Sequence, residues 1–158
     1  MAGKEGKGKS KRGCFIVFLV FAAIVGILAA IAVSGFLKFQ AKAKASEVKM
    51  NLGAIYTCQK IYYEENGKYA QTFEQMKWRP EGDNYYAYYC GDDMIPNTKR
   101  ELVILRPGND WPFPVRPQAL KNSFACMGVG SFDEDDTLDA WTINDEKVLK
   151  CIVDDDNE

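Results

Sequence analysis

The order of apolar and polar residues divides this chain of 158 residues into a long helical part and a part built from short strands. Residues 14–37 carry no charge and are mostly apolar, and residues 38–66 continue without a proline. In the second stretch, apolar residues recur at spacings typical of one helix face, at Val48, Leu52, Ile55, Tyr62 and Tyr63. The pattern predicts one helix over about residues 14–66.

The helix is expected to end at Asn66 and Gly67, because both residues tolerate the left-handed backbone conformation. Short apolar runs separated by Gly, Asn, Asp and Pro then indicate strands at 85–90, 102–105, 123–130, 138–143 and 148–153. In the third run, Phe124, Cys126 and Val129 are expected on one apolar face. A helix followed by strands predicts an α+β fold, with the helix packed on a small antiparallel sheet.

The apolar run is long enough to cross a bilayer, which needs about 20 residues. A buried core helix would normally show a polar stripe, and a cleaved secretory signal has an apolar region of only about 7–15 residues. We therefore interpret the run as a retained membrane helix. The predicted organisation is a basic cytoplasmic leader (1–13), a transmembrane half-helix (14–37), an amphipathic half-helix (38–66) and a β-rich head (67–158).

Charge is distributed unevenly, although the formal net charge is only −2. Residues 1–13 carry five basic residues and one acid, whereas residues 131–158 carry 11 acids and two lysines. The basic N-terminal flank favours a cytoplasmic N-terminus and an exported head. Exported domains commonly contain disulfides, and the candidates here are Cys58, Cys90, Cys126 and Cys151. Four cysteines allow three pairings, which the sequence leaves open.

Enzymatic chemistry has no recognisable basis in this sequence. The chain contains no histidine, which excludes Ser-His-Asp, Cys-His and zinc–histidine sites. It has no glycine-rich phosphate loop and no CxxC motif. Tyrosines cluster at Tyr85, Tyr86, Tyr88 and Tyr89, but few basic residues lie among them, so packing is favoured over nucleic-acid binding.

Two further stretches have two interpretations each. The carboxylates of Asp133, Asp135 and Asp139 could together bind calcium, which is the one cofactor that the sequence suggests. A solvated acidic turn would explain the same residues as well. Residues 106–117 hold four prolines together with Trp111 and Phe113. This loop is either a contact surface for another subunit or a rigid cover on the core.

Three stretches carry a resemblance to a known family: residues 26–32, 36–47 and 51–56, which join a membrane helix to an unbroken polar continuation. With the short basic leader ending at Gly13, they resemble the type IV pilin and pseudopilin superfamily. The resemblance implies leader cleavage between Gly13 and Cys14 by a prepilin peptidase. It also implies partners: an inner-membrane assembly platform and other pilin-like subunits. Small and apolar residues would pack the helices, at Gly26, Ala29, Ala30, Ala32 and Phe36.

The sequence departs from the family pattern at three positions. Phe18 stands where prepilins usually carry a glutamate, Cys14 stands where they usually carry phenylalanine, and Ser34 stands in place of a common proline. An acid in the bilayer is costly unless paired, so its loss makes the helix more stable in lipid. These departures favour a minor, initiating or non-assembling pilin-like protein over the main fibre subunit.

The sequence therefore predicts a structural pilin-like subunit of a type IV pilus or a related secretion pseudopilus. It would be anchored once in the bacterial inner membrane with a periplasmic head, and it would reach the cell surface if assembled. The alternative is a permanently anchored periplasmic sensor or binding module, with calcium as its ligand, that never forms a filament.

Overall fold

The computed structural model describes residues 9–99, 110–130 and 138–153, apart from the side chains of residues 9–12, 31–38, 40 and 41. The strand predicted at 102–105 lies outside this part of the chain. The chain divides into two units, Met1–Gln40 and Ala41–Glu158, and each is described by itself.

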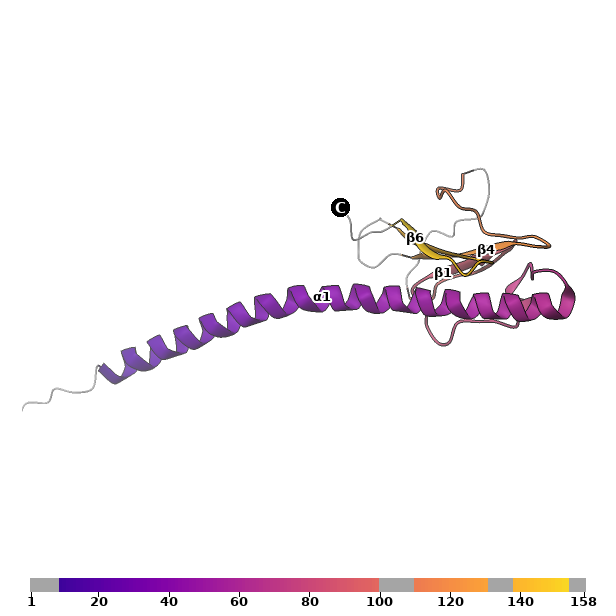
Figure 1. Cartoon of the computed structure of the whole chain (residues 1–158). Coiled ribbons are helices and arrows are strands. Elements are labelled where there is room, and N and C mark those ends of the chain that lie inside the picture. The colour runs from indigo at the N-terminus through magenta and orange to yellow at the C-terminus, as the bar shows by residue number, and fades with distance from the viewer. Residues whose placement is uncertain (1–8, 100–109, 131–137, 154–158) are drawn as a thin grey trace, which may run out of the picture. The chain divides into compact units, whose positions relative to one another are not determined.

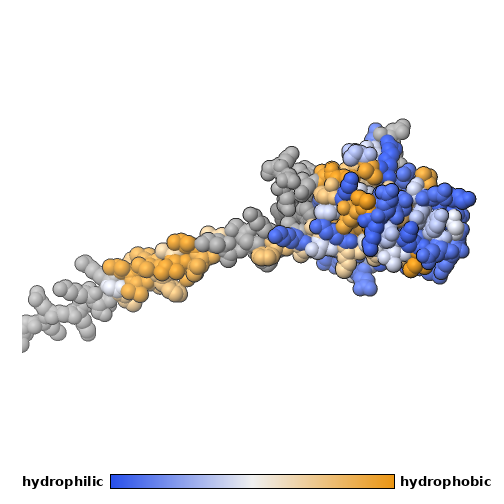
Figure 2. Space-filling model, viewed as in Figure 1, coloured by the Kyte–Doolittle hydropathy of each residue, from blue (hydrophilic) through white to orange (hydrophobic). Residues whose placement is uncertain are grey.

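The first unit contains the beginning of helix α1 (Lys9–Asn66). The helix begins a few residues earlier than the sequence pattern predicts. All side chains from residue 13 to residue 30 are exposed, and Figure 2 shows hydrophobic residues along this segment. Among the residues described, Gly13–Ala30 is the segment that is long and apolar enough to cross a membrane.

The second unit begins with the rest of α1, which ends as predicted. Gly67 follows the helix with a φ of 68°, and its N–H donates to the carbonyl oxygen of Tyr63 at 2.8 Å. A short helix that the sequence pattern did not predict, α2 (Phe73–Met76), comes next. Thr72 caps it, because the side chain of Thr72 accepts a hydrogen bond from the Gln75 N–H.

The strands form one antiparallel sheet beside α1, as Figure 1 shows. They are β1 (Ala87–Cys90), β2 (Asp93–Ile95), β3 (Gln118–Ala119), β4 (Phe124–Gly130), β5 (Asp139–Asn144) and β6 (Leu149–Val153). The order in the described sheet is β2-β1-β4-β5-β6, and β3 pairs with β4. The predicted α+β architecture is confirmed, although β2 and β3 were not predicted.

Both faces of the sheet are buried. On one face, Tyr88, Cys90, Phe124, Cys126 and Ile143 pack in a core with Val48, Leu52 and Ile55 of α1. On the other face, Ala87, Tyr89, Met127, Val129 and Ala140 pack with Trp111 and Phe113. Successive side chains of a strand point to opposite faces, so every residue of β4 is buried on one side or the other.

The position of Val129 corrects one prediction. Phe124 and Cys126 share the face that packs on α1, whereas Val129 lies with Met127 on the opposite face. The strand period of two requires this, because Val129 is an odd number of residues from Cys126. Because both faces of this strand are buried, an apolar residue such as Val129 can lie on either face, and its apolar character alone does not predict which one.

The proline-rich segment is a cover for the core over its described residues, 110–117. The side chains of Trp111 and Phe113 are buried, and their rings pack edge to face with centroids 5.3 Å apart. The indole N–H of Trp111 donates to the carbonyl oxygen of Val115 at 2.7 Å, which closes the turn. Of the two interpretations, the structure therefore favours the rigid cover.

Candidate functional site

The apolar part of α1 in the first unit is a candidate for function because nothing in that unit covers its described side chains. Phe15, Phe18 and Leu28 are 63%, 65% and 61% exposed. Apolar surface in water costs roughly 25 cal/mol per Å², so a long exposed helix of this kind requires lipid or other apolar helices around it.

The predicted packing residues lie within this exposed helix. Gly26, Ala29 and Ala30 are exposed, and a β-carbon built at Gly26 would meet no atom within 4 Å. Gly13 and Cys14, the predicted cleavage position, are exposed as well. Phe36 belongs to α1, but its side chain lies outside the part that the structure describes.

In the second unit, the predicted apolar stripe fixes the rest of α1 to the sheet. Val48, Leu52 and Ile55 are fully buried, and Tyr62 and Tyr63 pack at the margin of the same core. Full burial of one such aliphatic side chain contributes about 1.5–3 kcal/mol. The head is therefore held firmly by the half-helix that the sequence pattern identified.

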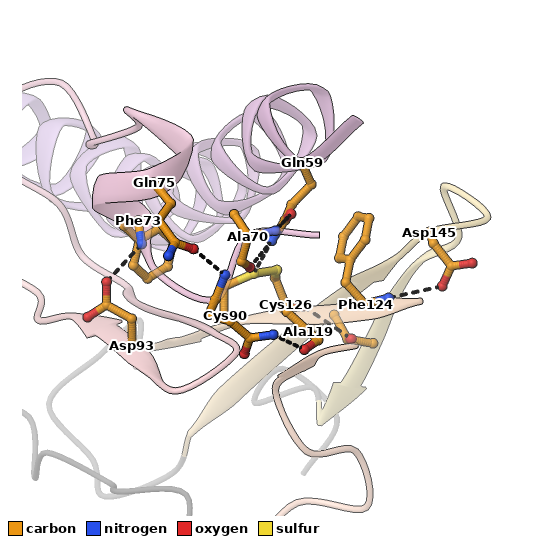
Figure 3. Close-up of a disulfide and its surroundings, with 12 residues drawn as sticks. Gln59, Ala70, Phe73, Gln75, Cys90, Asp93, Ala119, Phe124, Cys126 and Asp145 are labelled. Carbon is orange, nitrogen blue, oxygen red and sulfur yellow. Dashed lines mark hydrogen bonds between the residues drawn. A yellow bond between two sulfur atoms is a disulfide. The ribbon is translucent and has the colours of Figure 1, made fainter. Parts of the chain in front are cut away.

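A buried glutamine extends this stripe and was missed by the sequence pattern. Gln59 lies four residues after Ile55 and is fully buried. Its Oε1 accepts from the Ala70 N–H at 2.8 Å, and its Nε2 donates to the Ala70 carbonyl oxygen at 2.9 Å. Figure 3 shows Gln59 reaching from α1 to Ala70, beside the disulfide. The helical spacing from Ile55 was a signal that Gln59 faces the core. Because Gln59 is polar, it was not counted among the buried positions.

Polar contacts also join α1 to β1 and to the residues just before it. The Tyr85 N–H donates to Oε1 of Glu47 at 3.1 Å, and Nδ2 of Asn51 donates to the Tyr88 hydroxyl at 2.7 Å. Partial burial raises the pKa of Glu47, and burial raises the pKa of Tyr88 above its ordinary range. These contacts fix the position of the helix along the sheet.

One disulfide forms among the four predicted cysteines. Cys90 and Cys126 are joined, and they lie directly opposite each other in β1 and β4 with Cα atoms 4.4 Å apart. This spacing is that of a non-hydrogen-bonded antiparallel pair. Cys58 and Cys151 remain thiols, and the Cys151 thiol donates to the Val153 carbonyl oxygen at 3.0 Å. Burial raises the pKa of the Cys58 thiol.

Asp139 is the one predicted calcium ligand that the structure describes. Its side chain is buried, and Oδ2 accepts from the Tyr86 hydroxyl and from the Trp141 indole N–H, each at 2.6 Å. Asp133 and Asp135 lie outside the described residues. Within the described ranges, no three potential ligand side chains gather into a metal site. Calcium binding through these residues stays a prediction.

Comparisons with known proteins agree with this architecture. The family model described as "Type IV pilin PilA" matches residues 39–104. The "Type IV major pilin protein PilA" of Myxococcus xanthus (strain DK1622) is 45% identical over 87 residues, which cover 52% of this chain. The chain spans 40% of the length of that relative. Together with the exposed apolar helix and the half-helix packed on an antiparallel sheet, these matches show that the chain is similar to type IV pilins.

Proposed function

We propose that the chain is a structural subunit of a type IV pilus or of a related secretion pseudopilus, and that it assembles through the apolar part of α1. The observation that carries this proposal is the exposed, uncharged segment Gly13–Ala30. In lipid the segment is stable as a membrane anchor. In a filament, equivalent segments of other subunits replace the lipid, and small residues such as Gly26 let the helices approach closely.

The proposal includes a location and a maturation step. Basic residues precede the apolar segment, which supports a cytoplasmic N-terminus, and the Cys90–Cys126 disulfide supports a head in an oxidising compartment such as the periplasm. A prepilin peptidase would cleave between Gly13 and Cys14, and an inner-membrane platform would then assemble the subunits. The head would reach the cell surface in a pilus.

The proposal is tested by recovering the chain from filaments sheared from cells of its source bacterium. Leu28→Lys places a charge in the exposed apolar segment, where Leu28 is 61% exposed. Leu120→Lys makes the same change at an exposed leucine of the head, where the side chain is 54% exposed. A lysine near the bilayer centre costs about 2.5–3.5 kcal/mol, so Leu28→Lys should lose membrane insertion and filaments.

Recovery of wild-type chain and Leu120→Lys in the sheared fraction, with a mature N-terminus at Cys14 by mass spectrometry, supports the proposal. The minor-subunit expectation would be checked by the abundance of the chain in that fraction. If the wild-type chain stays entirely in the membrane with residue 1 or 2 at its N-terminus, the filament proposal is wrong. That result would favour the permanently anchored module.

A further inference from the structure

A small pocket lies at the end of α1 in the second unit. It is formed by the last residue of the helix, the residues that follow it and the turn between β3 and β4, and its volume is about 280 Å³. Lys68, Gln71, Leu120 and Lys121 are among the residues that line it. This volume is near the lower end of the range for small-molecule sites, so the pocket can hold one molecule of about the size of a monosaccharide.

The walls of the pocket are fixed by contacts within the head. The Leu120 N–H donates to the carbonyl oxygen of Ser123 at 2.8 Å, which closes the turn between β3 and β4. Nε2 of Gln71 donates to the carbonyl oxygen of Ala119, which joins this turn to the segment after α1. Tyr69 is buried, and its ring packs against two neighbouring aromatic rings. The pocket is therefore formed by the fold itself, before any ligand binds.

Two lysines make the pocket positively charged. The side chains of Lys68 and Lys121 are exposed, and neither forms an ion pair with a carboxylate in the part of the chain that the structure describes. No aspartate or glutamate is among the described residues that line the pocket. Two like charges beside one small cavity repel each other, and an anion between them relieves that repulsion. The pocket is therefore suited to a ligand with a double negative charge.

Amide oxygens supply hydrogen-bond acceptors beside these charges. Nδ2 of Asn66 donates to the carbonyl oxygen of Tyr62 at 2.9 Å, and Nε2 of Gln71 donates to that of Ala119. The amide oxygens of Asn66 and Gln71 accept no hydrogen bond from the described residues. Such oxygens can accept hydrogen bonds from the hydroxyl groups of a ligand.

Leu120 adds an apolar surface to the same pocket. Its side chain is 54% exposed, although it belongs to a turn whose backbone is fixed. An apolar contact beside a few placed polar groups is the usual composition of a small-molecule site. The ligand should therefore combine a dianionic group with hydroxyl groups and with C–H surface.

We propose that this pocket binds a phosphorylated sugar. A phosphate monoester carries a charge of about −1.5 to −2 at pH 7, which matches Lys68 and Lys121, and lysine binds phosphate as a point charge. The hydroxyl groups of the sugar donate to the amide oxygens of Asn66 and Gln71, and its C–H groups contact Leu120. This binding site goes beyond the proposed assembly function, because it concerns the head alone.

The proposal is tested by nuclear magnetic resonance of the ¹⁵N-labelled full chain in detergent micelles at pH 7. Glucose 6-phosphate should shift the amide signals of Gly67, Lys68 and Leu120 in a saturable way. Glucose, which lacks the charge, and inorganic phosphate, which lacks the sugar, should each bind at least about fivefold more weakly, as the loss of one set of contacts would produce. The absence of saturable shifts with glucose 6-phosphate would overturn the proposal. Equally tight binding of inorganic phosphate would overturn the role of the sugar.

Variants assign the binding to the two lysines. Lys68→Ala and Lys121→Ala should each weaken the binding of glucose 6-phosphate about fivefold, the value expected for an exposed ion pair. The melting temperature should not change, because both side chains are exposed. Lys150→Ala is the matched control, since Lys150 is an exposed lysine of β6 that does not line the pocket, and it should bind like the wild-type chain. Wild-type affinity of the double variant Lys68→Ala, Lys121→Ala would contradict the proposal.

Competition distinguishes two sources of the same ligand chemistry, a phosphorylated glycolipid and a free sugar phosphate. Displacement of glucose 6-phosphate by lipopolysaccharide, but not by lipopolysaccharide treated with phosphatase, supports the proposal and identifies the glycolipid as the source. Displacement by neither supports a free sugar phosphate. Equal displacement by both would show that phosphate is not recognised, and the proposal would then be wrong. None of these results depends on whether the chain forms filaments, so failure of the binding site leaves the assembly function standing.

Discussion

Gly128 of β4 lies so close to Val48 of α1 that a β-carbon at position 128 would overlap Cγ2 of Val48. The same β-carbon would also contact the ring of Tyr88, at 3.4 Å from Cε1. The helix can therefore approach the centre of the sheet only because this strand position has no side chain. The close approach of Val48 to β4 therefore depends on this glycine.

Gly128→Ala should destabilise the head by about 1–3 kcal/mol, because the added methyl group must displace Val48 or move the helix. Urea unfolding of the full chain in detergent, followed by tryptophan fluorescence, measures the change. Gly53→Ala is the matched control: its β-carbon meets no atom of the chain, so it should stabilise the helix by about 0.5–1 kcal/mol. Equal effects of the two variants would contradict this account of Gly128.

Gln59→Leu should destabilise the head by about 2–4 kcal/mol, because it leaves both the N–H and the carbonyl of buried Ala70 without their partner. Gln75→Leu removes one hydrogen bond from an exposed glutamine, the bond that its Oε1 accepts from the Gln71 N–H at 2.8 Å. That control should cost no more than about 1 kcal/mol. Thermal unfolding of both variants compares them, and similar melting temperatures would count against a structural role for Gln59.

Loss of the disulfide should destabilise the head by about 3–4 kcal/mol, the chain-entropy value for a loop of this size. Cys90 and Cys126 are separated by 36 residues in the sequence. The double variant Cys90→Ala, Cys126→Ala and the reduced wild-type chain should unfold at similar urea concentrations. A reducing agent should shift the wild-type chain and leave the double variant unchanged. A shift of the double variant on reduction would show that another bridge contributes.

Two of the eight tyrosines, Tyr86 and Tyr88, should resist ionisation in alkaline solution while the head is folded. Burial raises the pKa of both hydroxyls, and the Asp139 carboxylate raises that of Tyr86 further. The unfolded chain loses these protons above about pH 10, whereas the folded chain keeps them, so stability falls as the pH rises past that point. Tyrosinate absorbance measured against pH, with circular dichroism as the folding readout, tests this. Ionisation of all eight before unfolding would contradict it.

Local periodicity was sufficient to predict the helix and the side that it buries. Val48, Leu52 and Ile55 repeat at helical spacing, and Asn66 and Gly67 supply a local stop signal. The apolar segment could also be predicted, because its length and its lack of charge can be read directly from the sequence, without knowledge of the fold. These features of the candidate site depend on neighbours in the sequence.

The features that were missed depend on neighbours in space. Gln59 is buried because Ala70 lies opposite it. Val129 is buried on the side of the sheet opposite Cys126 because the proline-rich segment covers that side. The pairing of Cys90 with Cys126 requires the register of β1 and β4. Composition and spacing within one segment contain none of this information.

The burial of both faces of the sheet has a consequence for how the surface of the head can change. Side chains on β4 are committed to one core or the other, so substitutions there carry a folding penalty. In the part of the head that the structure describes, the exposed surface includes turns, loops and the sheet edge at β6, where Leu149 and Val153 are partly exposed. Substitutions at those surface positions should have little effect on the interior, so the outer surface of the head can change while the scaffold stays the same.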